Sequence, residues 1–204
     1  MAEHQLSERE RDELKELGNI GAGRASRYLS DLVDKKVDIG IPDVRIVDLQ
    51  EGGEKMAKQV FKKKSDQKLT AVLMPLKDGG GAIVFAFEQM DYQRFLNMWK
   101  EGSGGEGNGN FLQVSKKVGS FYLEAIENLL GIELESEEPK LMTLDTNALA
   151  IHTTSGMNSE CGPEKDCVLA INTEMKIADS ESRITMLLEH NHVQKMLNSM
   201  EEKL

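Results

Sequence analysis

The chain has 204 residues and a formal net charge of −10, from 25 Lys and Arg against 35 Asp and Glu. This length is enough to bury a core without disulfides or a structural metal, and the negative charge disfavours nucleic acid, whose phosphates it would repel. No apolar run approaches the roughly eighteen residues of a membrane-spanning helix, and the N-terminus is charged from Glu3 onward, so we expect a cytoplasmic protein without membrane insertion.

The first predicted element is a long helix that begins near Ser7 and ends near Asp34. Ser7 and Glu10 fit a capping box, in which each side chain bonds to the backbone N–H of the other residue. One side of the helix is an apolar stripe with small residues where another element can come close, namely Leu14, Leu17, Gly21, Ala25, Tyr28 and Leu32. Residues 37–41 then alternate as a half-buried strand does, up to Pro42.

The opposite side of this helix carries what we call the polar front. Its six positions lie within about 80° of one another, at a rotation of about 100° per residue, and are Asp12, Glu16, Asn19, Gly23, Ser26 and Ser30. An acid, an amide and small residues leave room for another macromolecule to dock. A Glu and an Asn three residues apart are also common on ordinary solvated helices, so spacing alone leaves both interpretations open.

The order of elements repeats when the chain is shifted by 97 positions, which brings Pro42 onto Pro139 and Leu32-Val33 onto Leu129-Leu130. Each half has a long helix, an alternating strand, a longer extended stretch, a hairpin and a short amphipathic helix. The predicted hairpins span 68–87 and 167–187, the short helices 91–99 and 192–200, and the glycine-rich connection 103–110. We expect one domain over 1–204, made of related halves at about 1–102 and 103–204.

Other features favour no chemistry of their own. The glycine-rich connection lacks the Gly-Lys-Ser/Thr of a phosphate loop, and the lysines between 55 and 68 are interpreted as a solvated loop. Cys161 and Cys167 have no diagnostic spacing, and His190 and His192 lack an obvious third ligand, so we expect unremarkable thiols and no metal site.

Asp12, Glu16, Asn19 and Pro42 at these spacings, with the run 18–23 and the duplicated layout, resemble the CheC family of chemotaxis phosphatases, which includes CheC, CheX and FliY. Length and layout look like CheC itself, because the switch domain of FliY has no counterpart here. The resemblance implies an α+β fold: a duplicated pseudo-two-fold unit with a β-sheet core and two long exposed helices. It also implies hydrolysis of the aspartyl phosphate of the response regulator CheY.

The resemblance assigns roles along the front. Asn19 would be catalytic, its amide oxygen holding the attacking water without adding negative charge. Glu16 would be the second catalytic residue, pairing with a lysine of the regulator. Asp12, Gly23 and Ser26 would be docking positions. The chain is expected to bind no cofactor of its own, with Mg²⁺ on the regulator.

The second half departs from the family pattern. The positions that match Asp12, Glu16 and Asn19 are Gly109, Gln113 and Lys116, and an ammonium cannot accept a hydrogen bond from water. We therefore expect this second site to be inactive. An alternative register uses Ser120 and Glu124, but Asn128 is then one residue too far along. The competing hypothesis is a non-catalytic adaptor that binds the deamidase CheD or phosphorylated CheY, and a flagellar switch component is a weaker third.

Overall fold

The structure, a computed structural model, describes residues 6–49, 53–61, 67–77, 79–103, 107–155, 157, 167–189, 192–193, 195 and 198–199. Its helices are α1 (Glu8–Val33), α2 (Gly53–Phe61), α3 (Gln89–Ser103), α4 (Gly107–Leu130) and α5 (Thr146–Thr154). Its strands are β1 (Val37–Ile39), β2 (Asp43–Asp48), β3 (Lys68–Pro75), β4 (Gly81–Glu88), β5 (Lys140–Asp145), β6 (Cys167–Ile177) and β7 (Ser180–Glu189).

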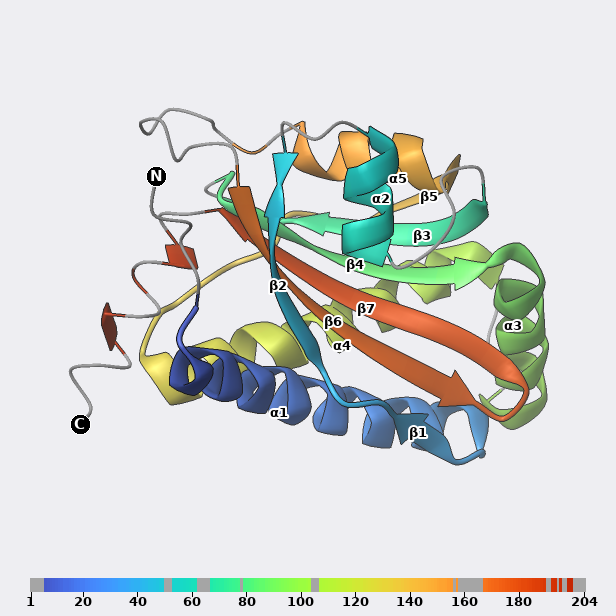
Figure 1. Ribbon diagram of the computed structural model, residues 1–204. Coiled ribbons are helices and arrows are strands. Elements are labelled where there is room, and N and C mark those ends of the chain that lie inside the picture. The colour runs from blue at the N-terminus through green and yellow to red at the C-terminus, as the bar shows by residue number, and fades with distance from the viewer. Residues whose placement is uncertain are drawn as a thin grey trace.

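The described strands form one antiparallel sheet with helices on both faces (Figure 1). The strand order is β1-β6-β7-β4-β3-β5, and β2 also pairs with β6. Helices α2 and α5 cover one face, α1 and α4 lie along the other, and α3 stands at one end of the sheet. This arrangement confirms the predicted α+β class and puts both long helices on the same side.

One row of residues, each paired with the next on a neighbouring strand, runs across the sheet from β2 to β5. The row runs through Asp43, Asn172, Thr185, Val84, Leu73 and Lys140. Its ends, Asp43 and Lys140, are the first residues of β2 and β5, and each directly follows a proline. The two edge strands therefore begin at matching places in the sheet, as the alignment of Pro42 with Pro139 predicts.

Helix α1 forms as its local sequence predicts. Ser7 is the N-cap of a complete capping box with Glu10, and Asp34 ends the helix in the left-handed conformation at φ 51°. The predicted apolar stripe faces the core, with Leu14, Leu17, Gly21 and Ala25 buried and Tyr28 and Leu32 packed at its edge. Because this stripe is covered, the polar front is left on the outside.

Helices α1 and α4 lie side by side and run in opposite directions (Figure 1), and a glycine allows their close contact. A Cβ atom built on Gly21 would lie 2.8 Å from the ring of Tyr122 and 3.1 Å from its Cα. Tyr122 is fully buried, and burial raises the pKa of its phenol. Tyr28 adds an edge-to-face contact with Phe121, with ring centroids 5.8 Å apart.

Helices α2 and α5, and the residue at which α4 begins, differ from the sequence prediction. Helices α2 and α5 occupy stretches predicted to be extended, so Lys55 and Lys58 are helical and not in a loop. Nine residues give only two turns of periodicity, and burial of Val60, Phe61 and Leu149 against the sheet stabilises these helices. Helix α4 begins at Gly107, inside the predicted connection, because the aromatic core holds Phe111 completely buried.

Some expectations fall on residues beyond this description. Residues 104–106 of the connection, Cys161, His190 and residues 194, 196, 197 and 200 of the predicted helix at 192–200 lie outside the described residues. Within the described part of the chain, no helix combines the length and the hydropathy that crossing a bilayer requires.

The glycine contact predicts opposite effects for the same substitution at two positions of α1. Gly21→Ala should lower the free energy of unfolding by about 1 kcal/mol or more, because the new methyl overpacks the buried Tyr122 ring. Gly23→Ala should raise it by about 0.5–1 kcal/mol, because no atom lies within 4 Å of its Cβ position and alanine favours helix. Urea denaturation of both variants measures the difference. Equal stabilisation would show that α1 and α4 are not in close contact at Gly21.

Candidate functional site

The structure leaves two side chains of the polar front without a partner. Glu16 and Asn19 are exposed, and neither side chain forms a hydrogen bond or ion pair within the part of the chain that is described. They are separated by three residues, so they lie on the same side of α1 about one turn apart. An acid and an amide are therefore presented to solvent together, with all their hydrogen-bonding capacity available.

The remaining polar residues of the front are engaged within the protein. Lys15 Nζ lies 2.9 Å from Asp12 Oδ1, and the Ser26 hydroxyl donates to the carbonyl oxygen of Gly23 at 3.0 Å. Ser30 Oγ accepts a hydrogen bond from the Val37 N–H at 3.1 Å. Asp12 is exposed despite its pair with Lys15, so its proposed docking role stays a prediction.

Pro42 packs directly on the backbone of α1 beside Asn19. A Cβ atom on Gly18 would lie 2.9 Å from Pro42 Cβ and 3.1 Å from Ile171 Cγ2, so only glycine allows this approach. Arg11 fixes the same junction by donating from Nη1 to the carbonyl oxygen of Val44 at 3.0 Å. The turn before β2 thus borders the front at a set position. The sequence analysis assigned no packing role to Gly18. The only signal for such a role was a glycine directly before Asn19.

The matching positions of α4 present a different surface. Lys116 Nζ lies 2.5 Å from Glu138 Oε1, and Glu138 is the residue before the buried Pro139. Gln113 is exposed, and Gly109 falls in the first turn of the helix. The position that corresponds to Asn19 is therefore occupied by a cation that is already neutralised by its own chain.

The alternative register on α4 uses residues that bond within the two-helix layer. Arg24 Nη1 of α1 lies 3.3 Å from Glu124 Oε2, and Ser120 Oγ lies 3.4 Å from Glu124 Oε1. Asn128 donates from Nδ2 to the carbonyl oxygen of Glu124 at 2.6 Å. The Arg24–Glu124 pair connects α1 to α4, and the three contacts together leave no acid and amide unpartnered in this register.

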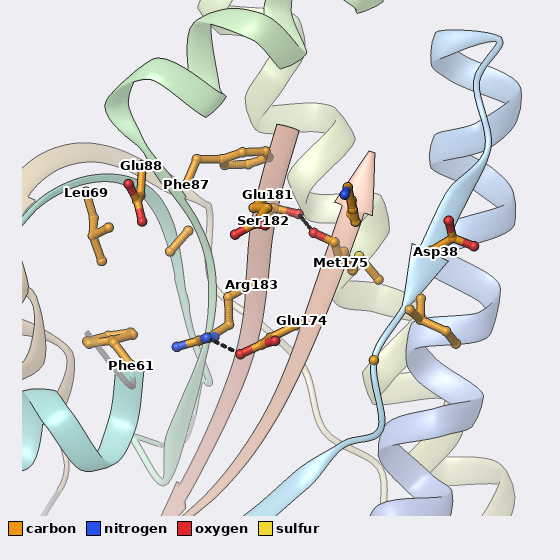
Figure 2. Close-up of a pocket in the computed structure, with 14 residues that line it drawn as sticks. Asp38, Phe61, Leu69, Phe87, Glu88, Glu174, Met175, Glu181, Ser182 and Arg183 are labelled. Atoms are coloured by element: carbon orange, nitrogen blue, oxygen red, sulfur yellow. Dashed lines mark hydrogen bonds and ion pairs between the residues drawn. The ribbon is translucent and has the colours of Figure 1, made fainter. Parts of the chain in front are cut away.

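A pocket of about 580 Å³ lies elsewhere, near the end of α2 (Figure 2). Its walls come from β1, α2, β3, β4, β6 and β7, and no residue of α1 contributes to it. Figure 2 shows Arg183 pointing toward Phe61, with Nη2 bonded to the Glu174 carboxylate. The candidate site is consequently an exposed helix surface, which suits a protein ligand better than a small molecule.

No group of three or more metal-ligating side chains occurs among the residues that are described. The polar front itself offers one carboxylate and one amide without partners, which is fewer oxygen ligands than Mg²⁺ or Ca²⁺ requires. The two unpartnered side chains have the hydrogen-bonding groups to accept from a water or from a cationic group of a partner.

Comparison with known proteins relates this surface to a family. Residues 10–46 match the model of the CheC-like family, and this segment contains Glu16, Asn19 and Pro42. The flagellar motor switch phosphatase FliY of Bacillus subtilis (strain 168) is 21% identical over 183 residues, which cover 85% of this chain and 44% of that protein. These matches support the predicted resemblance to the CheC, CheX and FliY family. The chain spans less than half the length of B. subtilis FliY.

Two solved structures share the fold over nearly the whole chain. FliY of Thermotoga maritima has a TM-score of 0.65 at 21% identity, with 98% of this chain and 99% of that chain covered. The middle domain of FliM from H. pylori has a TM-score of 0.60 at 11% identity, with 95% and 99% covered. These likenesses support the fold, and the predicted roles of Glu16 and Asn19 stay predictions.

Proposed function

We propose that this chain hydrolyses the aspartyl phosphate of a CheY-type response regulator, using Asn19 to position the attacking water. The observation that carries the proposal is the pair of exposed, unpartnered side chains Glu16 and Asn19, held on α1 beside the packed Pro42. The name of the FliY relative, a flagellar motor switch phosphatase, supports the same class of activity.

The proposed reaction needs positioning and no covalent intermediate on this chain. Water oxygen attacks phosphorus, the bond from phosphorus to the aspartyl oxygen breaks, and the products are an aspartate carboxylate and inorganic phosphate. The Asn19 amide oxygen accepts a hydrogen bond from the water and orients it in line, and the neutral amide adds no charge against the phosphoryl group. Mg²⁺ on the regulator would spread the charge that develops on the phosphoryl oxygens.

Glu16 acts by docking in this proposal. A carboxylate close to the phosphoryl oxygens would be repelled, but one turn away it can bind a lysine of the regulator through a charge-assisted hydrogen bond. Because the Glu16 carboxylate has no partner within the described chain, it breaks no internal contact when it binds. Docking then places Asn19 over the acyl phosphate.

Asn19→Ala should lower the rate of phosphate release about 10²-fold or more, because the water loses its orienting acceptor. Fold and binding should stay intact, since Asn19 is exposed on a helix and alanine favours helix. The matched control is Gln113→Ala, an exposed amide at an equivalent level of α4, which should leave the rate unchanged. Turnover is measured with a phosphorylated regulator in excess. A normal rate for Asn19→Ala removes this residue from the mechanism.

Glu16→Lys should weaken binding of the regulator by about 2 kcal/mol, or roughly thirtyfold in Kd, because like charges then meet at the docking pair. Glu127→Lys is the matched control, an exposed acid of α4 away from the front. Calorimetry with a beryllofluoride-activated regulator, a stable mimic of the phosphorylated form, measures both affinities. Equal affinities for the two variants would exclude the anchoring role.

One regulator should bind per chain, because α4 presents the Lys116–Glu138 ion pair where the front of α1 presents Asn19. Lys116→Ala should leave hydrolysis unchanged, and Asn19→Ala should leave none to assign to a second site. Titration should saturate at a stoichiometry of one. A stoichiometry of two, or turnover that survives Asn19→Ala and is lost with Lys116→Ala, would identify α4 as a working site. Binding without any hydrolysis by the unaltered chain would favour the non-catalytic adaptor.

A further inference from the structure

Ile41 is an apolar side chain held out into solvent next to the polar front. It is 86% exposed, against 70% for Met90, 50% for Ile151 and 38% for Ile39, the other exposed large apolar residues of the described chain. A single exposed apolar side chain is ordinary on a protein surface. Ile41 differs from an ordinary exposed residue in its place near α1 and in the fixed backbone of the residues on either side of it.

The backbone on both sides of Ile41 is fixed. The Gly40 N–H donates to the carbonyl oxygen of Glu174 at 2.8 Å, which attaches the turn to β6. Pro42 is buried and packs on Gly18 of α1, one residue before Asn19. Ile41 therefore projects from a short segment whose backbone needs little further ordering when a partner binds, which lowers the entropy cost of contact.

The other half of the chain has a different residue at this place. Pro42 and Pro139 precede the two ends of the residue row across the sheet, so Ile41 corresponds to Glu138. Glu138 pairs with Lys116, the residue at the level of Asn19. In the first half, where Glu16 and Asn19 have no partner among the described residues, the position is apolar and exposed. In the second half it is the acid that pairs with the lysine at the level of Asn19.

We propose that Ile41 is a docking residue for the response regulator and sets the affinity for it. This inference rests on the proposed function and extends the contact surface from α1 onto the turn before β2. The occupant is the regulator face that carries the acyl phosphate and its lysine, with an apolar depression at the rim that receives the Ile41 side chain. Burial of this side chain supplies affinity, while Glu16 and Asn19 supply orientation and chemistry.

The inference predicts a separation between KM and kcat. Ile41→Ser should raise KM for the phosphorylated regulator about tenfold, because the contact loses most of its apolar area. The value of kcat at saturation should stay unchanged, because Ile41 touches no reacting atom. Ile41→Leu should retain most of the affinity, and Ile41→Glu, which places the acid of the other half here, should weaken binding further.

Ile151→Ser is the matched control, since Ile151 is also exposed but lies on α5, across the sheet from α1. It should leave KM and kcat unchanged, and circular dichroism checks that all variants are folded. An unchanged KM for Ile41→Ser, or an equal rise for Ile151→Ser, overturns the inference while the proposed function stands.

Calorimetric affinity for the beryllofluoride-activated regulator distinguishes the docking role of Ile41 from the proposed hydrolysis. If the unaltered chain binds but does not hydrolyse, the proposed function fails, and the affinities of Ile41→Ser and Ile151→Ser still decide the docking role. Loss of affinity in the first variant alone supports the inference. Absence of binding by the unaltered chain overturns both.

Discussion

The close approach of α1 to its neighbours through glycine is the constraint on which the candidate site depends. Gly21 brings the helix against Tyr122 of α4, and Gly18 brings Pro42 against the helix on another side. Side chains at these positions would push the elements apart, because the facing Tyr122 and Pro42 are buried. With the helix held on both sides, its remaining surface is fixed in orientation, and that surface carries Glu16 and Asn19. Rigid support of this kind is what the proposed water-positioning role of Asn19 requires.

The sheet explains how a chain with two similar halves can present two different surfaces. The row from Asp43 to Lys140 puts β2 and β5 at equivalent places on opposite sides of the central β4 and β7 pair. The two edge strands therefore begin at matching places, but the side chains near them differ. On the side of α1, Glu16 and Asn19 have no partner within the described residues and Ile41 is exposed. On the side of α4, Lys116 and Glu138 neutralise one another. An exposed ion pair of this kind adds little to stability, so its main effect is on what the surface can bind.

Local chemistry and tertiary packing can be distinguished element by element. The capping box at Ser7, the end of the helix near Asp34 and the two hairpins follow from nearby residues, and the sequence predicts them correctly. Helices α2 and α5 are stabilised mainly by burial against the sheet, which a nine-residue pattern cannot show. The start of α4 in a glycine-rich segment likewise depends on the aromatic cluster around Phe111.

For the site, the sequence by itself determined which residues share the front of α1, because a helical period places Asp12, Glu16 and Asn19 on one side regardless of the rest of the fold. It also identified the lysine that replaces the amide in the second half. Only the tertiary structure decided which of these side chains are available. Asp12 pairs with Lys15, Lys116 pairs with Glu138 across more than twenty residues, and Glu16 and Asn19 have no partner in the part of the chain that is described. Periodicity fixes direction within one helix, but whether a polar group finds a partner depends on neighbours brought close by folding, such as the turn that holds Ile41 and Pro42 beside Gly18.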